Sequence, residues 1–221
     1  MKKPNVDYRK FKLSKINSPE FEHLKFLFGW VGYFAFYFIT ERFIPYESCT
    51  SVHSFLDDLI PFCEYFVVFY VGWYFLIAAT LIYFALYNTD LFKKFMTFII
   101  VTQVVAMAVY IIFPNRQDLR PEVFPRDNVF TDILALIYRF DTSTNVCPSL
   151  HVAYSVGIAS AWMREPSATK LAKTLITLFC FFVCISVAFV KQHSVMDIFA
   201  AIPVCVLAEY ITFYKKQKKT A

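Results

Sequence analysis

The sequence predicts an all-α membrane protein, a polytopic bundle of about six transmembrane helices with further helices at the membrane interface. Hydrophobic residues make up 58% of the 221 residues and aromatic residues 20%, and the mean hydropathy is +0.49, far from the usage of soluble domains. Long apolar runs also alternate with short polar turns. Glycine is sparse and no internal repeat stands out, which argues against an inverted-repeat transporter.

The apolar runs define the predicted spans, most of them near the ~20 residues needed to cross the hydrocarbon core. They cover residues 24–44, 62–87, 94–113, 150–163, 171–190 and 195–214. The fourth run is short, and we expect it to begin inside the protein, where lipid need not cover it. The predicted organisation is a basic tail over 1–23, a transmembrane domain over 24–214 and a second basic tail over 215–221.

The sequence predicts that two further segments lie at the membrane interface. Segment 45–61 mixes apolar and acidic residues, and its adjacent Asp57 and Asp58 are weak evidence for a metal site, because neighbouring side chains diverge and no His or third acid has ligand spacing. We favour a helix that is capped or tied at the interface. Segment 129–140 has apolar positions at helical spacing but is too short and too charged to span, so it predicts an interfacial helix.

The distribution of Lys and Arg orients the spans, because basic residues are retained in cytoplasmic loops. The N-terminal tail, the turns at 88–94 and 164–170 and the C-terminus are basic, whereas loop 45–61 has no Lys or Arg. Both termini are therefore predicted to be cytoplasmic. The net charge of +5 would suggest anionic partners in a soluble protein, but here it reports topology, so no nucleic-acid partner is predicted.

The six cysteines show no CxxC pair and no Cys/His ligand spacing, so the sequence predicts neither a metal nor another cofactor. Cys49 and Cys147 alone fall in loops that could face an oxidising side. The sequence leaves open whether these two residues form a disulfide.

Three clusters of polar residues fall on the predicted outer face. The first runs from Pro114 to Pro121, where Arg120 offers a planar fork of donors suited to phosphate oxygens and Pro121 fixes the backbone beside it. The second is Cys147 to His151. Ser149 suits a helix N-cap, and the free amides of a helix start attract an anion while His151 points from the first turn.

The third cluster is the stretch from Phe189 to Asp197, where two apolar runs meet. His193 and Asp197 are four residues apart and share one face of a helix, so the carboxylate can hold one ring nitrogen. The other nitrogen is then presented as a nucleophile or a base. Lys191 precedes this pair.

Each cluster also has a purely structural explanation: an arginine in a loop ion pair, a capped helix, and a hydrogen-bonded His–Asp pair. Ionisable groups beside lipid are costly unless they serve a function. The joint occurrence of the three clusters on one side of the membrane therefore favours a single anion pocket.

Taken together, Arg120-Pro121, Pro148-Ser149-Leu150-His151 and His193-x-x-x-Asp197 resemble, in order and in context, the three motifs of the type 2 phosphatidic acid phosphatase superfamily. The resemblance covers about 60–215 and implies a six-helix core. It implies that His193 attacks phosphorus to form a phosphohistidine while Asp197 orients the ring. It also implies that His151 protonates the departing lipid oxygen and then activates the acceptor, and that Arg120 and Ser149 hold phosphate oxygens without a metal.

The chain departs from that family's phosphatase pattern at two positions. Phe113 stands where a Lys is expected and Val187 where an Arg is expected. Arg116 and Lys191 are nearby basic residues that we expect to supply the missing charge. The tripeptide Lys191-Gln192-His193 is similar to the corresponding sequence in the branch of inositol phosphorylceramide synthases and related lipid phosphotransferases.

The leading hypothesis is a lipid phosphatase that hydrolyses a lipid phosphate or diphosphate at the outer leaflet, with the lipid tail between helices. A lipid phosphotransferase that passes the group to an alcohol is the alternative, since the two reactions share their first half. A non-catalytic transporter or scaffold belongs to a different class. The nearly wholly apolar spans argue against a transport path. The lipid phosphate and the membrane are the predicted partners, and oligomeric state is not indicated.

Overall fold

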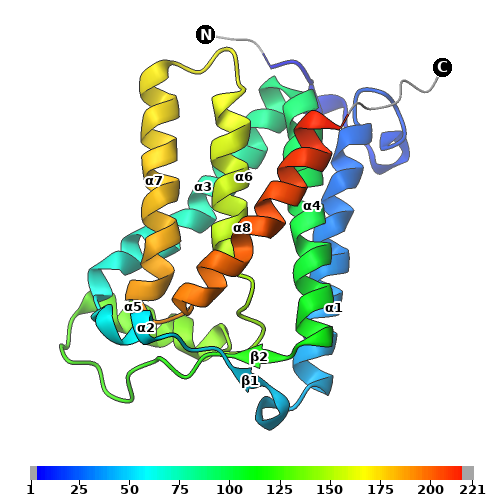
Figure 1. Ribbon diagram of the computed structural model, residues 1–221. Coiled ribbons are helices and arrows are strands. Elements are labelled where there is room, and N and C mark those ends of the chain that lie inside the picture. The colour runs from blue at the N-terminus through cyan, green and yellow to red at the C-terminus, as the bar shows by residue number, and fades with distance from the viewer. Residues whose placement is uncertain (1–3, 216–221) are drawn as a thin grey trace.

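The computed structural model of the chain describes residues 4–215 and is built mainly from helices (Figure 1). The α-helices are α1 (Phe28–Phe43), α2 (Phe55–Leu59), α3 (Val67–Tyr87), α4 (Thr89–Ile112), α5 (Val129–Phe140), α6 (Leu150–Met163), α7 (Lys170–Phe189) and α8 (Val195–Glu209). The shorter helical turns are η1 (Tyr8–Lys10), η2 (Leu13–Lys15), η3 (Glu22–Leu27), η4 (Tyr46–Ser48), η5 (Glu64–Phe66) and the π-helical η6 (Tyr210–Tyr214). Two short parallel strands complete the fold, β1 (Thr50–Ser51) and β2 (Asn115–Arg116).

Four helices in the described part of the chain are long and apolar enough to cross a membrane: η5 with α3, α4, α7, and α8 with η6. The prediction of a helical membrane protein is supported by these helices, but the predicted number of six spans is not reached. The helix α1 has 16 residues and α6 has 14, although both lie where spans were predicted. The short helix α6 is mostly buried by the neighbouring helices, as expected for a helix that begins inside the protein.

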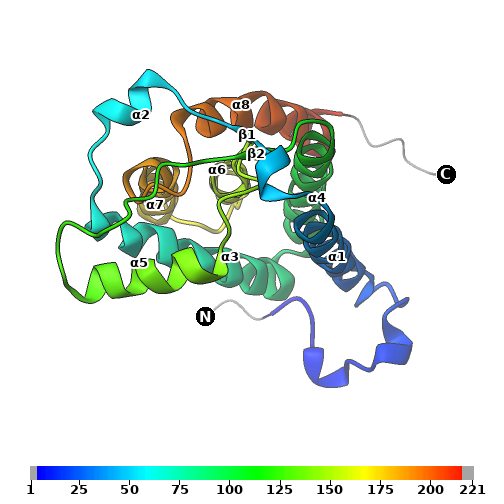
Figure 2. The same cartoon turned by 90° about the horizontal axis from the view of Figure 1, so that it is seen from below.

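The helix α6 lies at the centre of the bundle and packs against α3, α4, α7 and α8, while α1 packs on the outside of α4 (Figure 2). Its buried residues Ala153, Gly157 and Ala161 recur every four positions and form a stripe of small side chains. A Cβ atom at Gly157 would lie 2.7 Å from Cδ1 of Phe98 on α4. Small residues therefore let α4 and α6 approach closely, as is typical of helix pairs in membranes.

The outer surface of the bundle is strongly apolar. Large apolar side chains are exposed along α1, α3, α7 and α8, among them Phe28, Val31, Phe38, Phe75, Ile82, Leu171, Phe181 and Phe199. Soluble monomers rarely expose so much contiguous apolar surface. This surface is consistent with a lipid-facing exterior.

The helices α2 and α5 and both strands gather at one end of the bundle, opposite the end where the first and last described residues lie (Figure 1). The predicted helix over 129–140 is confirmed, since α5 has the same bounds, and it lies across the ends of the longer helices. Ser54 caps α2, and the side chain of Asp57 binds residues of a distant turn. The prediction of a capped, tied helix in segment 45–61 is therefore confirmed as well.

Candidate active site

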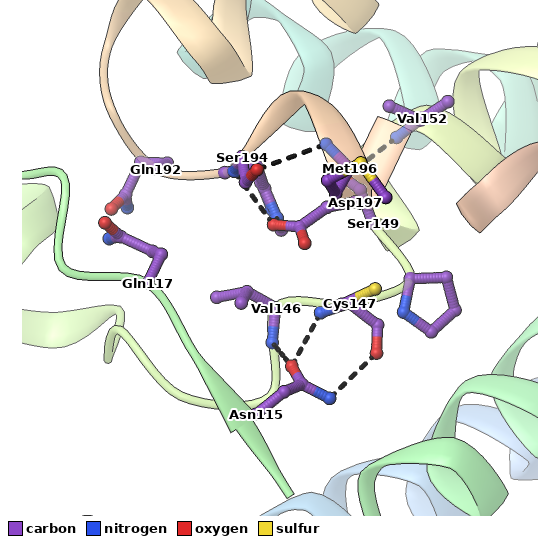
Figure 3. A network of polar contacts seen from close by, with 12 residues as sticks. Asn115, Gln117, Val146, Cys147, Ser149, Val152, Gln192, Ser194, Met196 and Asp197 are labelled. Atoms are coloured by element: carbon purple, nitrogen blue, oxygen red, sulfur yellow. Dashed lines mark hydrogen bonds and ion pairs between the residues drawn. The ribbon is translucent and has the colours of Figure 1, made fainter. Parts of the chain in front are cut away.

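His193 and Asp197 form a buried pair at the junction of α7 and α8. Nδ1 of His193 lies 3.1 Å from Oδ2 of Asp197, and His193 is 7% exposed. The same Oδ2 accepts a hydrogen bond of 3.0 Å from the backbone N–H of Ser194 (Figure 3). Asp197 is thus fixed by the capping box of α8, with Ser194 as N-cap. An Nδ1–H donated to this carboxylate leaves Nε2 of His193 with a free lone pair.

His151 faces this pair from the first turn of α6. The centres of the two imidazole rings are 5.6 Å apart and the rings are inclined by 66°. The His151 ring contacts Tyr70 and Trp73, with ring centres 4.5 and 4.4 Å away. Its Nε2 is buried and has no hydrogen-bond partner among the described residues. One bound group can therefore contact both imidazoles, which come from separate elements.

Both imidazoles line a cavity of about 710 Å³ that is bounded mainly by α1, α3, α5 and α6. Aromatic side chains form a large part of its wall, with Trp30, Tyr33, Phe34, Tyr37, Phe38, Trp73, Tyr74, Tyr110, Phe140 and Tyr154. The remaining polar lining is contributed by Asp141, Thr142, Thr144, Asn145 and Gln192. An apolar cavity with a few convergent polar groups is the usual form of a small-molecule site.

Arg120 lies beside this cavity but is bound to protein acceptors. Its guanidinium donates to the carbonyl oxygens of Tyr138, Asp141 and Thr142 at 3.1, 2.7 and 3.0 Å. Its Nε donates to Oε1 of Gln192 at 2.9 Å. Burial lowers the pKa of this arginine from its usual value. In this arrangement Arg120 joins the end of α5 to the residue that precedes His193.

The other predicted phosphate-binding residues occupy different places. Ser149 is the N-cap of α6, as predicted, and its backbone N–H donates to the carbonyl oxygen of Asp197 at 3.1 Å. Arg116 forms an ion pair of 3.1 Å with Asp118, and Lys191 donates to two carbonyl oxygens of segment 54–60. Neither Arg116 nor Lys191 lines the cavity. The structure thus brings together His151, His193 and Asp197, with Ser149 behind them.

Asp141 is a carboxylate of the cavity that the sequence analysis did not single out. Its Oδ2 accepts hydrogen bonds from the Tyr70 hydroxyl at 2.7 Å and from Nε2 of Gln192 at 3.2 Å. Tyr70 contacts the His151 ring, and Gln192 precedes His193 in the chain. Asp141 is therefore connected to both imidazoles. The position of Gln192 next to His193 is the one sequence signal for this group.

Asn115 is a second missed residue, and it shapes the loop that leads to His151. Its Oδ1 accepts hydrogen bonds from the N–H groups of Val146 and Cys147, and its Nδ2 donates to the carbonyl oxygen of Cys147 (Figure 3). The Cys147–Pro148 peptide bond is cis. Cys49 and Cys147 are both free thiols, and burial, with the nearby Asp197 carboxylate, raises the pKa of Cys147 to about 12.

Among residues 4–215 there is no group of three or more His, Cys, Asp or Glu side chains arranged to hold a metal ion. Comparison of the chain with protein-family models, curated proteins and solved structures finds no match. The chemistry of the site is therefore argued from its geometry.

Proposed function

We propose that the protein is a membrane lipid phosphatase of the type 2 phosphatidic acid phosphatase kind, which hydrolyses a lipid phosphate or diphosphate through a phosphohistidine at His193. The observation that supports this best is the His193–Asp197 pair, whose imidazole lies with its ring centre 5.6 Å from that of His151 in a mainly apolar cavity. An imidazole held by a carboxylate and facing a second imidazole provides a nucleophile with an acid–base partner.

In the first half-reaction Nε2 of His193 attacks phosphorus and the bond from phosphorus to the lipid oxygen breaks. Protonated His151 gives its proton to that departing oxygen. The phosphorylated ring of His193 carries positive charge, which the Asp197 carboxylate at 3.1 Å stabilises. The lipid alcohol leaves through the apolar part of the cavity; for a diphosphate, the leaving group is the lipid phosphate.

In the second half-reaction neutral His151 takes a proton from water, whose oxygen attacks phosphorus. The bond from phosphorus to Nε2 of His193 breaks and inorganic phosphate is released. His151 is then protonated again and ready for the next lipid. The same two residues therefore exchange roles between the two steps.

The tail and the phosphate of the lipid bind in different parts of the cavity. The acyl or isoprenyl tail lies against the aromatic wall, and the phosphate lies between the imidazoles. For Arg120 to bind a phosphate oxygen, as its motif implies, the guanidinium must exchange one of its three carbonyl acceptors for that oxygen. We propose that Arg116 and Lys191, which are bound to acceptors outside the cavity, support the loops of the site instead.

The proposal includes a membrane orientation with six crossings, in which α1 and α6 cross together with the four longer helices. The described ends of the chain would face the cytoplasm and the site the opposite side. The gathering of α2, α5 and the strands at the end away from those chain ends supports this arrangement (Figure 1).

The test is release of phosphate from a panel of lipid phosphates and diphosphates by the purified protein, together with trapping of an acid-labile phosphoenzyme. We expect His193→Ala to abolish both signals. His53→Ala is the matched control, because His53 is exposed and pairs with Asp58 outside the cavity. Wild-type turnover by His193→Ala would contradict the proposed function.

Transfer to an alcohol is the second candidate, and Asp141 favours it. A carboxylate accepts a hydrogen bond from an alcohol, whereas it repels a phosphate dianion. Supplying labelled lipid phosphate with and without candidate alcohols separates the reactions. A phosphate ester of the alcohol, formed only when the alcohol is present, indicates transfer, and phosphate released without the alcohol indicates hydrolysis.

A further inference from the structure

Two segments far apart in the sequence cap each other's helices beside the candidate nucleophile. We call residues 54–60 and 191–197 the clasp. The Lys191 ammonium donates to the carbonyl oxygens of Asp57 and Ile60, at 2.8 and 2.6 Å, near the end of α2. In return, the Asp57 carboxylate accepts from the backbone N–H of Val195 at 2.8 Å, at the start of α8. The positive charge of Lys191 thus lies at the C-terminal end of α2 and the negative charge of Asp57 at the N-terminal end of α8. The helix dipole stabilises each charge at these ends.

A continuous chain of hydrogen bonds leads from Asp57 to His193. The Ser194 hydroxyl donates to Oδ2 of Asp57 at 2.6 Å and accepts from the N–H of Met196 at 3.1 Å. The N–H of Ser194 donates to the Asp197 oxygen that also binds His193 (Figure 3). Asp57 is 3% exposed, and Ser194 and Asp197 are fully buried. These contacts leave the turn before α8 little freedom to move.

The backbone of the turn also needs support. Lys191 has φ of 53°, a left-handed conformation that is strained for a residue other than glycine. Its side-chain contacts with α2 hold it there. Gln192 and His193 directly follow Lys191 in the chain. The clasp therefore determines the direction in which the His193 side chain points.

We propose that Asp57 is a positioning residue for the nucleophile: through Ser194 and the first turn of α8 it holds Nε2 of His193 in line with the phosphorus. This inference rests on the proposed function. Asp57 does not line the cavity, so its effect falls on the chemical step rather than on lipid binding.

The first test compares Asp57→Ala with Asp58→Ala. Asp58 is the adjacent carboxylate, but it is exposed and pairs with His53, so it provides a matched control. We expect Asp57→Ala to lower kcat about 100-fold with KM little changed, since a displacement of about 1 Å has this effect on an aligned reaction. Asp58→Ala should keep wild-type kcat. A rise in KM with unchanged kcat would overturn the inference.

A double-mutant cycle tests whether Asp57 acts through Ser194. If it does, Asp57→Ala combined with Ser194→Ala should lose no more activity than the more damaging single change. Fully additive losses would overturn the inference. Should Asp57→Ala fail to fold, Asp57→Asn retains an acceptor for the N–H of Val195 and serves in the same cycle, with an expected loss of about 10-fold.

A readout that needs no turnover is the rate at which diethyl pyrocarbonate modifies His193, followed by mass spectrometry of its peptide, with exposed His53 as the internal reference. Loosening the turn in Asp57→Ala should raise this rate. Unchanged reactivity together with wild-type kcat would overturn the clasp. Turnover by His193→Ala would instead overturn the proposed function, and with it the catalytic role of Asp57, while a raised modification rate in Asp57→Ala would still show that the clasp orders the turn.

Discussion

The role of His151 as the general acid can be tested by comparing substrates with different leaving groups. An acid matters most when the leaving oxygen is a poor leaving group, as in a lipid phosphate monoester, and least when the leaving group is already acidic, as in a diphosphate. We therefore expect His151→Ala to reduce monoester turnover by about 10²–10⁴-fold and diphosphate turnover much less. The ratio of kcat/KM for the two substrates measures this. Equal losses would contradict the role of His151 as the acid.

Asp141 allows hydrolysis and transfer to be distinguished at a second residue. Asp141→Asn removes the negative charge but keeps an oxygen that can accept from Tyr70 at the position of Oδ2. If the carboxylate orients an alcohol, the substitution should lower formation of the alcohol's phosphate ester about tenfold, because an acceptor hydrogen bond to a charged group is worth about 1.5–3 kcal/mol. Phosphate release in the absence of alcohol should persist. A parallel fall in both products would show that Asp141 does not select the acceptor.

The sequence could predict contacts between residues that are close in the chain, but not contacts between residues that are far apart in it. The His193–Asp197 spacing and the Ser149 cap each lie within one helical turn, so the sequence could indicate them. Asp57 binds Ser194 across 137 positions and Asp141 binds Tyr70 across 71. No spacing rule predicts such pairs. For the same reason the sequence could not show that the Lys191 ammonium would be bound by α2 carbonyl oxygens.

At the scale of elements, the close contact between α4 and α6 depends on Gly157. Gly157→Val would place its side chain against Phe98, where a Cβ alone already lies at 2.7 Å, and we expect unfolding to become easier by about 1–3 kcal/mol. Gly32→Val on α1 is the control, since no atom lies within 4 Å of a Cβ there. Both changes alter helix propensity by the same amount, so they differ only in packing. Equal shifts in Tm for the two variants would show that this packing is unimportant.

The apolar pattern gave most helix positions, because it reflects burial from water whether the neighbour is lipid or protein. The bounds of α5 and α6 agree with the predicted 129–140 and 150–163. The same property explains the disagreement over spans. Hydropathy cannot distinguish a helix surrounded by other helices from one that faces lipid, so the apolar pattern of the short central α6 does not by itself show whether it crosses the membrane.

For the molecule as a whole, the aromatic cavity should set the length of tail that the site accepts. Ala78 lines the cavity on α3, while the next residue, Ala79, is exposed and outside it. Ala78→Trp should raise KM for long-chain lipid phosphates about tenfold or more, because a bulky ring would occupy the place of several methylene groups worth ~0.8 kcal/mol each. Short-chain substrates should be less affected. Ala79→Trp should behave as wild type, and an equal effect of both changes would place the tail elsewhere.

The position of the site at one end of the bundle predicts its side of the membrane. Basic turns lie between the paired spans at the end near the described chain termini, whereas the loop between β2 and α5 lies at the opposite end (Figure 1). In that loop Val123 is 82% exposed. A protease site inserted after Val123 should be cut from the outer side of sealed right-side-out vesicles. Tags at both chain ends should be cut only after the membrane is permeabilised. Because an even number of crossings returns the chain to its starting side, cleavage of one tag but not the other from outside would exclude six spans. Cleavage of both tags from outside would reverse the orientation and place the imidazoles at the cytoplasmic leaflet.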